Sequence, residues 1–299
     1  IWAIDIHNPE RLTNIRYADD LIIYAKSWEE LSVMVELLSE ELAAVGLDLN
    51  AGKTKFLTTD TLDTPLFIDV ADGMVEVLHG DAVHKYLGRH ICGDLKQRGV
   101  TEFSHRIAAA WGKFHKHRPT LMNKNVSIHL RLKLFSSVVT PTALFGLSTL
   151  PLNKSQLQQL DITQRRMLRS IAGWAPLVDG DWAAAMRKTN ERVRLALIQF
   201  PVEPWTIQLA SRQFKLACRM AGDARPWPAR SVRWDPLDFD PSSPHLAHRS
   251  PGRPRRKWDH YLQLFSNETF PQHLSWIDAA GAEQDWLAME QEYQECFAS

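Results

Sequence analysis

The sequence predicts an α+β protein, in which a small mixed unit of strands and one helix precedes a larger helical unit. Short apolar runs between turn residues fill the first hundred positions, and apolar residues at helical spacing follow from Thr101 onward. Seven of the 16 prolines lie between Asp223 and Arg256, which predicts an irregular connection there. The expected divisions are a mixed unit at 1–98, a helical unit at 99–222, a Pro-rich basic linker at 223–257 and a short helical acidic tail at 258–299.

Amino-acid composition limits the classes of protein to which this chain can belong. The chain has 299 residues, of which 44% are hydrophobic and 23% charged. It can therefore bury a hydrophobic core and lacks the composition of an intrinsically disordered chain. The cysteines, Cys92, Cys218 and Cys296, form neither a disulfide framework nor a CxxC metal site, which favours a reducing compartment. We find no apolar run near the roughly 20 residues of a membrane span and no signal peptide, so we expect no membrane partner. Because the chain begins Ile1-Trp2 rather than with Met, we expect a fragment or a processed piece.

The zero net charge conceals an uneven distribution. Residues 1–100 have nine Lys or Arg against 17 Asp or Glu, residues 101–260 have 26 against 11, and residues 261–299 have none against seven. A polyanion-binding protein with a separate cation site needs such a basic block beside an acidic one. The same pattern also fits solvated helix faces that attract one another between domains, and charge alone leaves both interpretations open.

The first elements follow from alternation and capping residues. Two short strands are expected at 12–17 and 21–25, around the turn Ala18-Asp19-Asp20. Ser27 with Glu30 three residues later predicts a helix start, and Gly46 predicts the end of a helix of about five turns.

Further strands and helices follow in order. A strand is expected at 53–58, a hairpin with strands at 66–70 and 75–78, and one short strand at 86–91. Pro119 is expected to end the first helix of the helical unit, and Pro141 to interrupt the second. The expected helices are 103–118, 126–150, 154–172 (closed by Gly173), 181–200, 204–221, 258–265 and 283–296.

Two adjacent carboxylates, Asp19 and Asp20, stand at the expected tip of the first hairpin. Mg²⁺ takes oxygen ligands and keeps part of its water shell, so one or two carboxylates with substrate phosphates suffice to bind it. Such ions assist phosphoryl transfer by activating the attacking oxygen and stabilising the leaving one. Asp-Asp is also a common turn dipeptide, which is the structural alternative for this motif.

Tyr17-Ala18-Asp19-Asp20 resembles the catalytic signature of reverse transcriptases, and later blocks follow the order of LINE-type (non-LTR) retrotransposon enzymes. These blocks are residues 46–55, 84–91, 110–111, 138–146, 164–173 and the basic Gly-Arg-Pro segment 252–258. The resemblance implies the C-terminal half of an RNA-directed DNA polymerase. Its fold would be a partial palm of antiparallel hairpins plus one helix, then an all-helical thumb-like domain and an irregular tail.

The same resemblance implies roles for the turn. Asp19 would be the direct ligand of Mg²⁺ or Mn²⁺ in two-metal nucleotidyl transfer, and Asp20 a weaker ligand or electrostatic partner. Tyr17 and Ala18 would lie near the primer end and the incoming dNTP.

Two further pairs of residues match family blocks. Lys53 or Lys55 would neutralise the leaving pyrophosphate or donate a proton to it, and either can equally be an ordinary surface lysine. Leu87 and Gly88 match the family's primer-gripping turn, where glycine permits close approach of the backbone, although a plain β-turn explains this pair as well.

The basic block then becomes a surface for the RNA template and DNA primer, because a protein that holds a hybrid duplex without reading sequence needs Lys and Arg near phosphates. Spacings of seven and three can place Arg106, Lys113 and Lys116 on one helix face. The remaining candidates are Arg118, Arg131, Lys133 and the arm residues Arg253, Arg255, Arg256 and Lys257, of which the arm can also be a solvated linker. Tryptophans 205, 227, 234, 276 and 286 could stack on bases but are more often core residues.

The chain departs from the family pattern at its start. Only 18 residues precede Asp19, so the fingers, the third palm aspartate and the usual endonuclease domain are expected to be missing. We therefore expect this chain to be inactive alone and to act within a retroelement ribonucleoprotein, nuclear or cytoplasmic and not secreted. The alternatives are a degenerate remnant that only binds RNA or RNA–DNA hybrid, and an unrelated helical interaction protein.

Overall fold

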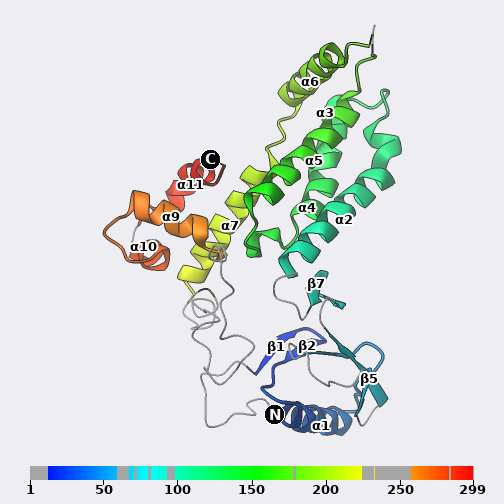
Figure 1. Ribbon diagram of the computed structural model, residues 1–299, viewed down its shortest axis with the longest axis vertical. Coiled ribbons are helices and arrows are strands. Elements are labelled where there is room, and N and C mark those ends of the chain that lie inside the picture. Colours follow the sequence, from blue (N-terminus) through cyan, green and yellow to red (C-terminus); the bar gives the residue numbers. More distant parts are fainter. Residues whose placement is uncertain are drawn as a thin grey trace. The chain divides into compact units, whose positions relative to one another are not determined.

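The computed structural model describes residues 13–58, 67–70, 73–79, 82–92, 98–177, 180–223, 232, 257–282 and 284–298. The chain forms two compact units, Ile1–Glu102 and Phe103–Ser299 (Figure 1). Both strands and helices are present, as the α+β prediction requires. Within the described ranges, no helix has the length and apolar character needed to cross a membrane.

The first unit begins with an antiparallel hairpin. Strand β1 (Asn14–Tyr17) pairs with β2 (Asp20–Ile23), and Tyr17 lies opposite Asp20. The connection is therefore only two residues long, which confirms the predicted hairpin and shortens its turn to Ala18-Asp19.

Helix α1 (Trp28–Ala44) confirms the predicted helix. The Ser27 side chain accepts a hydrogen bond from the Glu30 N–H, and the Glu30 carboxylate accepts one from the Lys26 N–H. Gly46 has a φ of +75°, which favours glycine where the chain leaves the helix. Val35 on the buried face of α1 belongs to a small core with Phe56 and other β residues.

A three-stranded sheet forms the rest of that core. Its order is β3 (Lys55–Leu57), β5 (Gly73–Leu78) and β4 (Phe67–Val70), so β4 and β5 form the predicted antiparallel hairpin. However, β3 pairs with β5 in parallel, which departs from an arrangement of antiparallel hairpins alone. Hydrophobic alternation predicts where strands occur but not which neighbour each one pairs with.

The prediction of one strand at 86–91 is wrong. The structure has two antiparallel strands there, β6 (Val83–Tyr86) and β7 (Arg89–Cys92). Leu87 and Gly88 separate them with φ values of +47° and +75°, and two successive positive φ values reverse the chain in a tight hairpin turn.

Helix α2 (Arg98–Leu121) leads into the second unit and is longer than predicted. It continues through Pro119, which removes one backbone hydrogen bond two residues before the end of the helix. The predicted interruption near Pro141 is present as a π-helical turn, η1, between two α-helices. These elements are α3 (Ile128–Leu134), η1 (Phe135–Val139), α4 (Thr140–Leu144) and the 3₁₀ turn η2 (Leu147–Thr149).

Three long helices follow, as predicted: α5 (Lys154–Ala172), α6 (Trp182–Gln199) and α7 (Trp205–Ala221). Asn153 and Gln156 form a reciprocal capping box at the start of α5. At its end, Gly173 adopts a φ of +90°. Helix α5 contacts both α6 and α7 (Figure 1).

The C-terminal elements are α9 (His260–Thr269), α10 (Trp276–Ala282), the 3₁₀ turn η4 (Trp286–Met289) and α11 (Glu290–Ala298). The predicted helix at 283–296 is thus two elements, and α10 was not predicted. These elements share one core with the preceding helices, in which Trp276, Trp286 and Tyr293 are buried together with Trp205.

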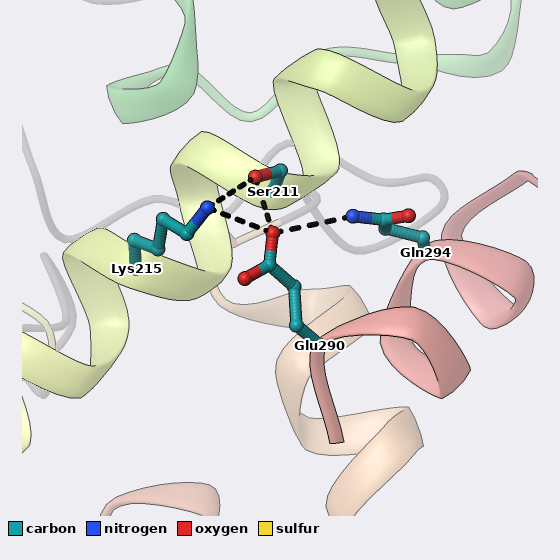
Figure 2. Close-up of polar contacts among 4 residues, drawn as sticks. All are labelled: Ser211, Lys215, Glu290 and Gln294. Carbon is teal, nitrogen blue, oxygen red and sulfur yellow. Dashed lines mark hydrogen bonds and ion pairs between the residues drawn. The ribbon is translucent and has the colours of Figure 1, made fainter. Parts of the chain in front are cut away.

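A polar cluster joins α11 to α7. Glu290 accepts hydrogen bonds from Ser211 and Gln294 and forms an ion pair with Lys215 at 3.0 Å (Figure 2). Lys215 also donates to the Ser211 hydroxyl at 3.1 Å. Attraction between the acidic C-terminal segment and the basic helical region is therefore realised here in a specific contact.

Candidate functional site

The β1–β2 hairpin carries the candidate carboxylates, Asp19 in its turn and Asp20 at the start of β2. Ala18 has a φ of +52°, a left-handed conformation that costs a non-glycine residue about 1–2 kcal/mol. Asp19 and Asp20 are exposed, and the Tyr17 side chain is 64% exposed. A rigid hairpin thus presents two carboxylates and one phenol to solvent, without burying the acids against basic groups.

Other elements of the first unit bring charged and polar groups within electrostatic range of Asp20. Burial lowers the pKa of His84 on β6, the Lys55 charge lowers it further, and the Asp20 charge raises it. Burial raises the pKa of Tyr86, and the Asp20 carboxylate raises it again. His84 and Tyr86 are two positions apart on β6 and therefore face the same side.

His84 was missed as a site residue by the sequence analysis. The available signal was its alternation with Tyr86 in a strand, but alternation does not reveal which other strand lies nearby. Only the fold places β6 where the charges of both Asp20 and Lys55 act on the same imidazole.

The two candidate lysines differ in their surroundings. Lys55 forms an ion pair with Glu76 at 3.0 Å, directly across the parallel pair of β3 and β5. Lys53 is exposed, and its backbone N–H donates to the Asn50 side chain in the turn before β3.

Leu87 and Gly88 form the tip of the β6–β7 hairpin, and Leu87 is exposed there. A buried carboxylate anchors this hairpin to the first turns of α2. Glu102 is 0% exposed, its Oε2 accepts a hydrogen bond from the His90 N–H at 2.7 Å, and its Oε1 lies 3.9 Å from the Arg89 Nε. Glu102 therefore fixes the position of the candidate primer-contacting turn.

The chemistry of the turn fits a hard divalent cation in part. Two neighbouring carboxylates meet the minimum that Mg²⁺ requires when substrate phosphates and water complete its shell. No group of three or more His, Cys, Asp or Glu that could hold a metal ion occurs in the part of the chain that the structure describes. The turn can therefore contribute ligands but does not form a complete protein cage.

The basic candidates of the second unit divide into exposed and buried residues. Lys113, Lys116 and Arg118 on α2 and Lys133 on α3 are exposed. Lys257, just before α9, is also exposed, whereas Arg253, Arg255 and Arg256 lie outside the described residues.

Arg106 and Arg131 are placed in the interior instead. Arg106 is 6% exposed, with its guanidinium 4.9 Å from the centre of the Phe145 ring. Arg131 is 9% exposed, its Nη1 donates to the Ile171 carbonyl at 2.6 Å, and burial lowers its pKa. Arg106 and Lys113 are seven residues apart and can share one face of α2, but Arg106 is buried whereas Lys113 is exposed. These two arginines therefore do not present a phosphate-binding surface.

The tryptophans divide in the same way. Trp205, Trp276 and Trp286 are buried, as the core interpretation predicts, while Trp227 and Trp234 lie outside the described residues. Among the tryptophans that the structure describes, Trp174 and Trp182 are exposed, and neither was selected from the sequence.

Residues 4–91 match the reverse transcriptase (RNA-dependent DNA polymerase) family. This segment contains the Ala18-Asp19 turn, both candidate lysines and the Leu87-Gly88 turn. The expected relationship to reverse transcriptases is therefore supported for this part of the chain.

An uncharacterized transposon-derived protein of Caenorhabditis elegans is 29% identical over 166 residues. The similarity covers 56% of this chain and 58% of the relative's length. No solved structure gives a significant match to this chain.

Proposed function

We propose that this chain is the C-terminal part of an RNA-directed DNA polymerase of a non-LTR retrotransposon, with the end of the palm in the first unit and a thumb in the second. One observation carries the proposal. The strained Ala18-Asp19 turn exposes the carboxylates of Asp19 and Asp20 to solvent, and it lies in the segment that matches reverse transcriptases. A retroelement ribonucleoprotein, nuclear or cytoplasmic, is the corresponding cellular setting.

In this proposal, Asp19 and Asp20 would hold Mg²⁺ or Mn²⁺ through their exposed carboxylate oxygens. The ions would activate the 3′ hydroxyl of the primer and stabilise the leaving pyrophosphate. Tyr17, exposed beside the carboxylates, lies against the primer end and the incoming dNTP together with Ala18. The Leu87-Gly88 turn holds the primer backbone.

We assign neutralisation of the pyrophosphate to Lys55 rather than Lys53. The charges of Lys55 and Asp20 both act on the pKa of His84, which supports a role for Lys55 in the same part of the first unit. Its ion pair with Glu76 holds the ammonium in a defined position.

The isolated chain is expected to be inactive. Two adjacent carboxylates cannot by themselves position two ions, and an error of about 1 Å can cost roughly 100-fold in rate. Primer extension on an RNA template tests this directly. Extension by the 299-residue chain that Asp19→Asn abolishes would contradict the expected inactivity while supporting the metal assignment.

A longer polypeptide provides the complementary test. If the reading frame continues upstream and encodes a further palm aspartate, the extended protein should extend a primer, and Asp19→Asn should stop it. An extended protein whose activity is unchanged by Asp19→Asn would contradict the assigned metal ligand.

The second unit is proposed to hold the template–primer duplex. Residues 103–177 have 11 Lys or Arg against Asp161 as the one acid, and Asp161 accepts hydrogen bonds from Thr206. The proposed surface comprises Lys113, Lys116, Arg118, Lys133 and the arm residues Arg253, Arg255, Arg256 and Lys257.

Salt dependence measures this contact. Binding to an RNA–DNA hybrid should weaken steeply with salt, and the double substitution Lys113→Ala/Lys116→Ala should reduce the slope by about 2. Lys26→Ala, which removes an exposed lysine of the first unit, is the matched control and should leave the slope unchanged. Binding without a salt slope would favour an unrelated interaction protein.

A remnant that only binds RNA or RNA–DNA hybrid is the second candidate. Salt-dependent hybrid binding, together with stop codons in the upstream frame, would support the remnant over the polymerase.

A further inference from the structure

The segment Gly173–Leu177, between α5 and α6, holds an exposed tryptophan in a fixed position. Arg192 of α6 donates through Nη1 to the carbonyls of Gly173 and Trp174, at 3.2 and 2.9 Å. The Ala175 N–H donates to the hydroxyl of the buried Thr189 at 3.0 Å. Three hydrogen bonds with one face of α6 thus hold the backbone on both sides of Trp174.

Trp174 nevertheless points away from the core. Its side chain is 50% exposed, whereas Trp205, Trp276 and Trp286 are each at most 2% exposed. Ala175, the next residue, is buried, so the segment turns a small residue inward and the indole outward. A rigid backbone that exposes a large π face at a fixed point suits stacking, because little conformational freedom remains to be lost on binding.

The chain on both sides of this segment is rich in basic residues. Residues 165–194 contain seven Lys or Arg against three Asp or Glu. Arg169, in the last turn of α5, donates from its Nε to the Asn190 Oδ1 at 2.9 Å. Arg192 uses only Nη1 for its contacts with described residues, so the hydrogens on Nε and Nη2 can face a ligand. Both guanidinium groups are therefore held beside the segment with donors suited to phosphate.

We propose that Trp174, Arg169 and Arg192 form a binding site for single-stranded nucleic acid, in which a base stacks on the indole and its flanking phosphates contact the two guanidinium groups. This inference extends the proposed function, because it adds a single-strand site to a chain proposed to hold duplex. An indole on a surface stacks most readily on an unpaired base, because the bases inside a duplex already stack on one another. Stacking is tolerant of sequence, and positive charge near the ring selects a polyanion over an apolar protein surface.

Fluorescence anisotropy with labelled oligonucleotides tests the site on the full chain. The probes are oligo(U) and oligo(dT) of about 15 nucleotides and an RNA–DNA hybrid of the same length. Trp174→Ala should weaken binding of both single strands by about tenfold or more, and hybrid binding by less than about twofold. Trp174→Phe keeps a π face and should stay within about threefold of the wild type. Leu195→Ala, which removes a comparably exposed apolar side chain on α6, is the matched control and should change neither affinity.

Several outcomes would overturn the site. Single-strand binding unaffected by Trp174→Ala, or equal losses on single strand and hybrid, would remove the stacking role. A loss of self-association in Trp174→Ala by sedimentation, without a loss of single-strand affinity, would assign the indole to a contact between copies. Loss on RNA but not on DNA would also contradict it, since stacking does not read the 2′ hydroxyl.

The proposed function can fail separately. If the wild type binds the hybrid with the expected salt slope while Trp174→Ala leaves single-strand binding intact, only the single-strand site fails. If the wild type binds neither single strands nor hybrid, both proposals fail.

Discussion

Replacing Glu102 should release the β6–β7 hairpin from the start of α2. The Glu102 carboxylate is fully buried and accepts a hydrogen bond from the His90 N–H at 2.7 Å, while it faces Arg89 at 3.9 Å. Glu102→Ala removes both contacts together. Because the Leu87-Gly88 turn is the tip of this hairpin, the substitution also loosens the proposed primer contact.

The magnitude follows from these two contacts. Leaving the His90 N–H without its acceptor should cost about 1–3 kcal/mol. The Arg89 side chain is 31% exposed, so water can solvate its guanidinium once Glu102 is removed. The free-energy cost of losing the ion pair is also partly offset, because the variant has no carboxylate to desolvate on folding. We therefore expect a local loss of about 2–3 kcal/mol. Glu102→Gln keeps an acceptor for the His90 N–H and should cost about 1 kcal/mol.

Native-state hydrogen exchange read by mass spectrometry measures this loss where it occurs. Amides of β6 and β7 should exchange roughly 30- to 150-fold faster in Glu102→Ala, since every 1.4 kcal/mol is a factor of ten. Amides of α5 and α7 should be unchanged. Glu36→Ala, at an exposed glutamate of α1, is the matched control. Wild-type protection of the hairpin in Glu102→Ala would refute the anchoring role.

Three further predictions concern other parts of the chain. Ala18→Gly should stabilise the β1–β2 hairpin by about 0.5–1 kcal/mol and slow its hydrogen exchange accordingly. Relief of the left-handed φ of +52° at Ala18 is partly offset by the conformational entropy cost of glycine. Faster exchange would argue against strain at Ala18. Partial burial opposes the charge of Glu290, but hydrogen bonds and the Lys215 ammonium outweigh it and lower the Glu290 pKa. Its contribution to stability is therefore present above the ordinary glutamate pKa and is lost as pH falls through the lower native value. Urea unfolding of Glu290→Gln should accordingly depend less on pH below about 4.3 than the wild type. Trp205→Ala should destabilise the helical unit by about 3–5 kcal/mol in urea unfolding, because it removes a buried ring and leaves a cavity. The indole N–H also donates to the Thr140 hydroxyl at 3.0 Å, and Thr140→Val, which removes only this hydrogen bond, should cost less.

Local signals predicted the elements that depend on a few neighbouring residues. Ser27 and Gly173 marked a helix start and a helix end correctly, since capping requires only contacts within one turn. The Asp19-Asp20 hairpin was also predictable, because alternation and turn residues act over two adjacent strands. The single strand assigned to 86–91 failed, because Leu87 is not a residue expected at positive φ.

Tertiary packing decided the features that bear most on function. Arg106 and Lys113 have the spacing of one helix face, yet neighbouring elements cover Arg106 and leave Lys113 open. The charges of Asp20 and Lys55 act in opposite directions on the pKa of His84, and the three residues lie on three different strands of the first unit.

The amino-acid sequence alone therefore determined the chemistry that is available: an acidic turn, basic helices and the order in which they occur. The tertiary structure decided which of these groups are exposed and which lie close to one another. Burial and proximity depend on contacts between segments far apart in the chain, and neither periodicity nor capping residues report such contacts. Trp174 illustrates the difference, because the segment that exposes it is held by hydrogen bonds with Thr189 and Arg192, which lie on the following helix.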